Sequence, residues 1–363
     1  MKSKAKAMEI LSMPNESLWR AKQFISSQGG QIAPMAISEE ELNPDEQDDL
    51  SYQAYPLESM DDTYRVSFEF PDDSVCSEFS FFEDGRQRTI QIGYIPATYG
   101  TIHVLIPVHY FVIASVILQR EERELKLWSA PRVRQGIFVE RSLVPDQTAL
   151  EHIAQQGLDV VDIHAQGGDY YALRKRTLQE AKRIRLELET RLIEEWRTSP
   201  DSEDQLLVVD GTLMNFRNEE NIERCVGVSK SFGSRYFSIS DHNRILRMNE
   251  FNRSWVFRFH SPEDENDALN LGQRERLSWY LRLRDRHNSD PEFGLIRVEI
   301  SLRHINNFQE RVETISRSLL SERLPTSYPT PRWDKHLYPI RSCEKYLSSI
   351  MPSIQTVAAT MKG

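Results

Sequence analysis

Two aspartates of this 363-residue chain share one local setting. Asp84 in FFEDGR and Asp210 in VVDGTL each follow an apolar, strand-like run and precede a glycine. A strand end would hold each carboxylate on rigid backbone, and the glycine would let a metal ion or substrate approach closely. Two such carboxylates on neighbouring strands could bind hard divalent cations, and two ions about 4 Å apart can hydrolyse a phosphodiester. Asp-Gly is also a common turn pair, so either aspartate alone could simply mark a turn.

A long helix between the two aspartates could add a third carboxylate. The stretch from Leu173 to Trp196 contains no glycine or proline and carries an apolar stripe at helical spacing. Its candidate ligands are Glu187, Glu189, Glu194 and Glu195. Glu189 falls within the widened apolar face, whereas Glu187 falls on the opposite margin and could pair with Arg191 one turn later. Helical geometry therefore favours Glu189.

The surrounding pattern predicts an α/β protein. Before the helix we expect hairpin-connected strands at Tyr64–Phe70, in the run ending at Asp84, in the run after a tight turn at Gly85, at Ile102–Pro107 and at Tyr110–Leu118. After it we expect strands at 206–210, 224–231, 255–260, 278–286 and 294–302, then helices over about 306–320 and from Tyr338 onward. A long helix followed by a buried strand favours an α/β layer over an all-β sandwich.

The two ends of the chain are expected to lie outside the main domain. Residues 15–28 predict a short helix, and residues 39–62 hold ten acidic and no basic side chains. This acidic stretch is interpreted as a mobile linker or cover; a DNA-mimicking shield is the alternative. The predicted organisation is a helix and acidic linker over 1–63, one domain over 64–350, and a tail over 351–363.

Composition excludes several classes of protein. Three widely separated cysteines without a CxxC spacing argue against zinc and a disulfide framework, and fit a cytoplasmic protein. The chain lacks a GxSxG elbow and a GxxxxGK[ST] loop, and its longest apolar run, 104–118, is short for a membrane span. Charge is asymmetric: residues 1–229 hold 24 Lys and Arg against 39 Asp and Glu, and residues 230–363 hold 21 against 16. That asymmetry suits an enzyme with acidic metal ligands and a basic surface for phosphate, although two unequal solvated surfaces explain it equally well.

One basic, aromatic stretch could follow a nucleic-acid strand. Phosphate contacts and base stacking would come from Arg274, Arg282, Arg284 and Arg286 with Trp279 and Tyr280. The alternative interpretation is an ordinary solvated face of a strand.

The order of these motifs resembles one known family. A DG pair, a long helix with RxxxEL, a strand ending in DGTL, then GVSK, LGQR, RVEI and a late YP helix are similar to NurA, the nuclease that works with the hexameric ATPase HerA. The resemblance covers residues 75–350, and VVDGTL followed by VGVSK is its most specific part. It implies a ribonuclease H-like mixed sheet flanked by helices, a ring-shaped homodimer, and manganese-dependent (or magnesium-dependent) cleavage of DNA in repair or antiviral defence.

The resemblance also assigns roles to residues. It maps the metal-binding aspartates to Asp84 and Asp210, with two ions expected. Its RxxxEL pattern selects Glu187 rather than Glu189, and both are kept as catalytic candidates. It places Lys230 as a catalytic group that could hold the scissile phosphate, although an exposed strand-end lysine is the alternative. Tyr338, of the YP pair, joins the candidates for nucleic-acid binding.

One position departs from the family pattern. The family carries a metal-site histidine eight residues after the tyrosine of the YP pair, where this chain has Tyr346. A phenol is a poor substitute for a neutral imidazole ligand. Either Glu344, His336 or water fills the gap, or the site is weakened. The alternative function is therefore a catalytically weakened scaffold subunit that binds DNA or the motor.

Overall fold

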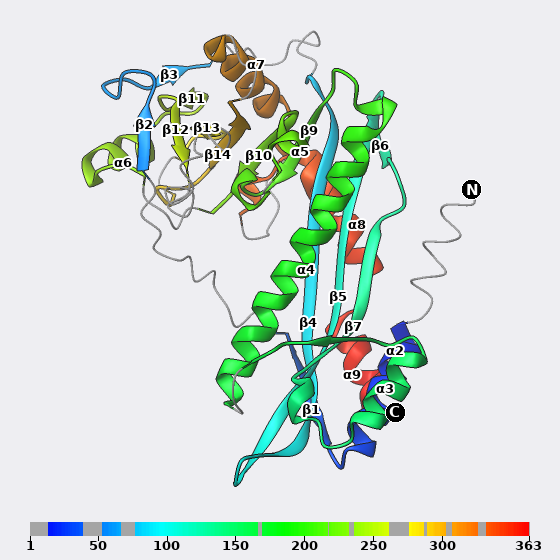
Figure 1. The fold of residues 1–363 in the computed structure, drawn as a ribbon. Coiled ribbons are helices and arrows are strands. Elements are labelled where there is room, and N and C mark those ends of the chain that lie inside the picture. The colour runs from blue at the N-terminus through cyan, green and yellow to red at the C-terminus, as the bar shows by residue number, and fades with distance from the viewer. Residues whose placement is uncertain are drawn as a thin grey trace.

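A long β-hairpin forms the spine of the molecule (Figure 1). The computed structural model describes residues 14–38, 53–66, 77–165, 169–216, 218–231, 236–260, 276–286, 289–302, 307–325 and 332–362. Strands β4 (Phe79–Tyr99) and β5 (Ile102–Glu121) pair along nearly their whole length. The sequence predicted several shorter strands with a tight turn at Gly85, and this is wrong. Gly85 lies inside β4 opposite Ser115.

The hairpin belongs to one large mixed sheet. Its main path runs in the order β2 (Gln53–Pro56), β12 (Phe257–His260), β13 (Arg276–Arg282), β14 (Leu295–Ser301), β10 (Cys225–Ser229), β9 (Leu206–Asp210), β4, β5, β7 (Arg132–Val139) and β8 (Asp159–Asp162). Central strand β9 runs parallel to both β4 and β10, whereas β14 runs antiparallel to both of its neighbours, β10 and β13. Short strands β1 (Gln31–Ser38), β3 (Tyr64–Arg65), β6 (Glu124–Leu127) and β11 (Asn252–Arg253) pair off this path.

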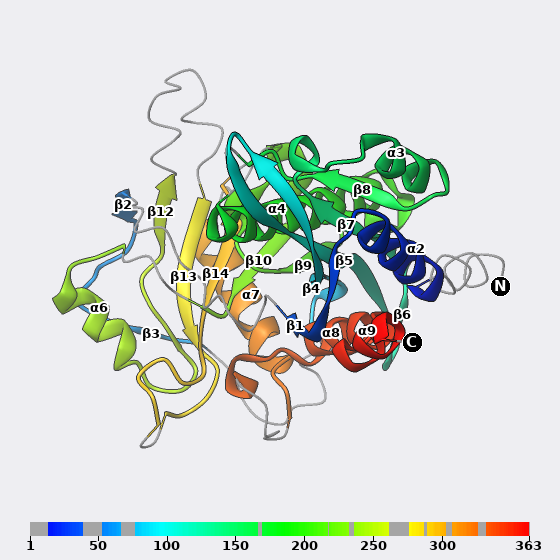
Figure 2. The ribbon, with the colours of Figure 1, turned by 90° about the horizontal axis from the view of Figure 1, so that it is seen from below.

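Helices cover the two faces of the sheet (Figures 1 and 2). Helix α4 (Tyr170–Thr198) packs along β4 and β5 on one face, and α8 (Tyr338–Ile350) packs on the other. The remaining helices are α2 (Pro14–Ser27), α3 (Gln147–Gln155), α5 (Glu219–Ile222), α6 (Ile239–Leu246), α7 (Phe308–Ser321) and α9 (Ile354–Lys362). The prediction of an α/β fold with a mixed sheet flanked by helices is thus confirmed. None of the helices in the described ranges is both long and apolar enough to cross a bilayer.

The first and the last described helices are both built into this architecture. Helix α2 packs against α9 and α3, and α9 packs against β1, burying Val357 and Met361. The expected tail over 351–363 is therefore a packed helix, because these apolar side chains recur at the four-residue spacing of one helix face.

Part of the acidic stretch is also structured. Strand β2 pairs with β12, and the buried Glu58 carboxylate accepts two hydrogen bonds from the Arg253 guanidinium, at 2.6 and 3.0 Å. The linker interpretation thus does not hold for residues 53–62, because buried pairing anchors them to the sheet; residues 39–52 lie outside the described ranges.

Candidate metal centre

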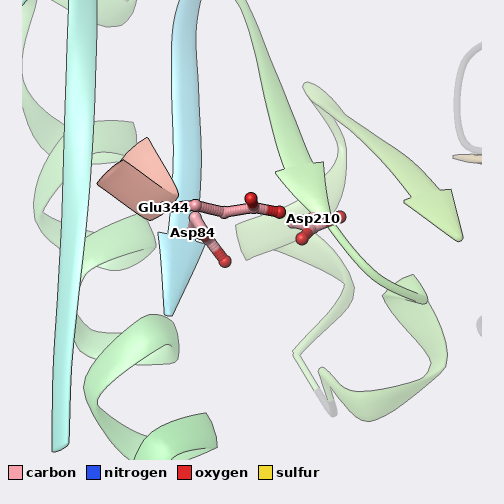
Figure 3. A group of neighbouring side chains, drawn as sticks. All are labelled: Asp84, Asp210 and Glu344. Atoms are coloured by element: carbon pink, nitrogen blue, oxygen red, sulfur yellow. The ribbon is translucent and has the colours of Figure 1, made fainter. Parts of the chain in front are cut away.

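Three carboxylates from distant parts of the sequence converge on one point. Ligand oxygens of Asp84, Asp210 and Glu344 all lie within 4.8 Å of one another. Figure 3 shows their side chains turned toward one another from β4, β9 and α8. The sheet register explains the first two: Glu83 pairs with Val209 across parallel strands, so the next residues, Asp84 and Asp210, are neighbours on the same face. The predicted meeting of the two aspartates is what the structure shows.

The two Asp-Gly pairs differ in local structure. Asp210 ends β9 as predicted, and Gly211 turns the chain with φ +121°, a conformation that favours glycine. Asp84 is not at a strand end, because β4 continues past it to Tyr99. The rigidity of a paired strand holds this carboxylate in either case.

Gly85 makes room for a side chain rather than for a metal ion or substrate. A Cβ at this position would lie 1.9 Å from Oε1 of Glu189. Because strand residues alternate between faces, Gly85 and Glu83 point toward α4, while Asp84 points toward α8. Glu189 is therefore buried against β4 from the opposite side of the sheet. It is not one of the three converging carboxylates.

Glu189 is nevertheless within electrostatic reach of the aspartates. Burial, opposed by the Arg185 charge and aided by Asp210, raises the pKa of Glu189 to about 7.

Glu187 is on a different flank of α4. Its carboxylate forms ion pairs with Arg183 and Arg191, one turn before and one turn after it. The structure therefore does not bring Glu187 to the aspartates, and the motif-based choice of Glu187 as a metal ligand is corrected. The physical reason is that the arginine of RxxxEL is an (i, i+4) partner of this glutamate on the helix surface.

Lys230 is the central counter-charge. Its Nζ lies 3.0 Å from Oδ2 of Asp210 and 2.9 Å from Oε1 of Glu344, and the side chain is buried. Burial opposes the charged form, but the adjacent Asp210 and Glu344 carboxylates outweigh it and raise the pKa of Lys230. Lys335 Nζ donates to the Lys230 carbonyl at 3.1 Å, which fixes the backbone there. Lys230 is thus a buried site residue rather than an exposed strand-end lysine.

Glu344 supplies the third carboxylate of the cluster. Burial favours its neutral form, but Lys230 and a hydrogen bond from Arg341 lower the pKa of Glu344 to about 2. His336 Nε2 lies 3.9 Å from Glu344 Oε1, whereas half-buried Tyr346 packs against the core. Of the alternatives for the position of the family histidine, Glu344 is the one placed beside both aspartates.

A signal for Glu344 exists in the sequence. The buried face of α8 contains Ile340, Cys343 and Leu347, and Glu344 completes the i, i+3, i+4, i+7 pattern with them. A carboxylate within an apolar stripe is the feature that marks a ligand here, more than its distance from the tyrosine.

Asp84 is the carboxylate without local compensation. It is buried, and no hydrogen bond or ion pair reaches its side chain from the described residues. Burial and the neighbouring Asp210 charge raise the pKa of Asp84 well above its usual range, against the partial effect of Lys230. A buried anion without a partner is costly unless it is protonated or binds a cation.

These residues fit a hard divalent cation. Carboxylate oxygens are the ligands that magnesium, calcium and manganese prefer. Among the described residues, no positively charged side chain lies at hydrogen-bond distance from Asp84, so a bound cation would balance its charge. The donor set does not identify the ion.

A second buried network holds the turn that follows Asp210. Fully buried Glu299 in β14 accepts hydrogen bonds from Thr212 Oγ1, at 2.8 and 3.0 Å, and from Leu213 N, at 2.8 Å. Arg297 balances its charge at 2.6 Å. Sequence reasoning missed this role; a glutamate between Val298 and Ile300 in an apolar strand was the available signal.

The predicted nucleic-acid residues of β13 are structural. Arg282 is buried and donates to main-chain carbonyls of Pro291, Phe293 and Leu246. Trp279 and Tyr280 are buried as well, because β13 is covered on both faces. Neither the predicted binding surface nor the alternative of a solvated face fits Arg282, Trp279 and Tyr280, because all three are buried.

The other candidates have mixed outcomes. Arg284 donates to the Leu324 carbonyl and stacks over the Trp333 ring, which leaves its guanidinium engaged within the fold. Tyr338, at the start of α8, is 49% exposed and open to a ligand. Arg274 lies outside the described residues.

Comparisons with known proteins do not supply a family. No protein-family model matches the chain, and no curated protein matches it. The NurA resemblance therefore remains a proposal based on motif order.

Proposed function

We propose that this protein is a divalent-metal-dependent deoxyribonuclease with a ribonuclease H-like core, acting with a HerA-type hexameric ATPase in DNA repair or antiviral defence. The observation that carries the proposal is the convergence of Asp84, Asp210 and Glu344, with Asp84 lacking a counter-charge at hydrogen-bond distance among the described residues. A homodimer and action on DNA ends or single strands come from the motif resemblance and belong to the same proposal.

The roles of the residues follow from their positions. Asp84, Asp210 and Glu344 would hold manganese or magnesium, and an ion bound there would supply Lewis acidity toward a phosphodiester. Glu189, across Gly85, is a further carboxylate on the α4 face and the candidate ligand for a second ion. Lys230 now pairs with Asp210 and Glu344. With a cation bound to these carboxylates, the Lys230 ammonium would neutralise negative charge on the phosphate.

The test is cleavage of end-labelled single-stranded DNA with manganese, with magnesium and with EDTA. We expect metal-dependent product from the parent and a loss of at least about a hundredfold in Asp210→Asn, because removing one carboxylate charge weakens both metal binding and charge stabilisation. Exposed Glu203→Gln is the matched loss of one negative charge and should keep full activity. A parent that binds manganese but cleaves neither DNA nor RNA would refute the nuclease.

One observation favours a non-catalytic alternative. Lys230 and Arg341 already neutralise Glu344, and Tyr346 stands where the resembling family has its histidine. A scaffold subunit with this cluster would bind DNA or the motor without turnover. Binding by the parent that persists in Asp210→Asn, with no cleavage by either, would favour it.

A further inference from the structure

The first half of α4 is strongly basic in a chain of net charge −10. Residues 174–185 hold six basic side chains against one acidic one, whereas residues 186–198 hold two against four. The solvent-facing members of the basic half are Lys175, Arg176, Lys182 and Arg183. A local concentration of this kind on an acidic protein points to a polyanionic ligand.

Arg174 lies over the Tyr170 ring, and the other five basic side chains separate into two rows. One row follows alternating steps of four and three residues along a single flank: Tyr171, Lys175, Leu178, Lys182, Arg185 and Glu189. The other row contains Arg176 and Arg183. The Arg176 guanidinium donates to the Ile163 carbonyl, and the Arg183 guanidinium forms ion pairs with Glu180 and Glu187. In the first row, Arg185 forms an ion pair with Glu189 at 3.4 Å, whereas exposed Lys182 has no ion pair with any described residue.

The first row ends at the candidate metal centre. Its last member, Glu189, packs on Gly85, the residue after Asp84, and the Asp210 charge helps to raise the pKa of Glu189. The row extends over about 27 Å at the rise of an α-helix. Figure 1 shows α4 running alongside the β4–β5 hairpin toward the part of the sheet that holds β9.

The opposite end of the row offers an aromatic face. Tyr171 is 74% exposed at the start of α4. A ring in this setting can stack on an unpaired base, whereas a duplex keeps its base faces covered. Cations along one flank with an exposed ring at its end are the combination used for single strands.

We propose that the Tyr171–Lys175–Lys182–Arg185 row binds the backbone of single-stranded nucleic acid and leads it to the carboxylate cluster. This inference rests on the proposed function, because the direction of the strand assumes a nuclease centre at the carboxylates. The row replaces the arginines predicted between Arg274 and Arg286 as the path of the strand. The binding itself requires no metal and no cleavage.

The test measures binding without turnover. A fluorescently labelled 20-nucleotide single strand is titrated with the full chain in EDTA at several salt concentrations, and anisotropy gives Kd. K175Q/K182Q removes two charges of the row, and R176Q/R183Q removes two from the same turns on the other flank. We expect K175Q/K182Q to weaken binding about tenfold and to flatten the slope of log K against log salt by about 1.4, at about 0.7 per lost phosphate contact. R176Q/R183Q should change Kd less than twofold, and circular dichroism checks that both variants keep the fold.

The outcomes separate the two proposals. Equal weakening by both double variants, or none by K175Q/K182Q, would overturn the row as a binding path. Failure of the parent to bind any nucleic acid would overturn it as well. Binding that depends on the row, in a protein that never cleaves DNA with manganese, would support the row and reject the nuclease.

Discussion

The Lys230 ammonium lies 3.0 Å from Oδ2 of Asp210 and 2.9 Å from Oε1 of Glu344, two of the three converging carboxylates. The positive charge of Lys230 stabilises these two carboxylates when no metal ion is bound. Removing one partner of a buried pair leaves the others uncompensated, which typically costs about 3–5 kcal/mol.

We therefore predict that Lys230→Met lowers the free energy of unfolding by about 3 kcal/mol in EDTA. Manganese should recover more stability in this variant than in the parent, because the ion replaces the lost positive charge. Denaturant unfolding with and without manganese measures both effects. Lys126→Met, at an exposed pair on β6, should change little. Equal stability of Lys230→Met and the parent in EDTA would contradict the assigned role.

Gly85 and Glu189 form the second pair that can be tested. Gly85→Ala places a Cβ 1.9 Å from Glu189 Oε1, so the carboxylate must move away from β4. We expect a loss of about 1–3 kcal/mol, typical of overpacking. The double variant Gly85→Ala/Glu189→Ala should recover much of that loss, since the side chain that clashes is gone. Chemical denaturation of the two single variants and the double variant gives the coupling; additive losses would show that the two positions do not compete for space.

Some parts of this arrangement could be predicted from the sequence, and others could not. Asp84 and Asp210 were identified because apolar runs set the strand positions, and α4 because its stripe is long and free of glycine. Glu344 was not chosen over His336 or water, since which side chain of α8 reaches β4 depends on how the helix packs. The turn at Gly85 was wrong because glycine signals are local, while the packing of Glu189 against it is long-range. The alternation around Arg282 predicted an exposed side chain, and this was wrong because periodicity cannot reveal that a strand is covered on both faces.

Glu189 predicts a pH dependence of stability. Its pKa is raised to about 7 by burial, aided by Asp210, above the usual 4.5. A carboxyl with a raised folded-state pKa binds more protons in the native state, so its contribution to stability declines as pH rises from about 4.5 to about 7 and is constant above that. Glu189→Gln removes this decline. In EDTA, we expect the variant to gain on the parent across this window by up to about 3 kcal/mol, at 1.36 kcal/mol per pKa unit. Urea unfolding at pH 4.5, 6 and 8 measures the gain, and a difference that does not vary with pH would rule out the raised pKa.

The hydroxyl of Thr212 connects the candidate metal centre to the buried network of β14. It donates to Glu299 two residues after Asp210, so it fixes the turn from which the Asp210 carboxylate extends. Thr212→Val keeps the shape of the side chain and removes its hydrogen bond to the buried Glu299 carboxylate. We expect the free energy of unfolding to fall by about 1–3 kcal/mol, because that carboxylate loses a donor. Thr177→Val is the matched control, because its hydroxyl donates to the Leu173 carbonyl within α4, well before Glu189 in the chain. Both variants should lose some stability, but only Thr212→Val should also weaken manganese binding. We expect Kd to rise roughly tenfold if the looser turn reduces the binding free energy by about 1.4 kcal/mol. Calorimetric titration of manganese into the two folded variants decides the matter: equal affinities would mean that the strand end alone positions Asp210, and that the Glu299 network serves only the stability of the fold.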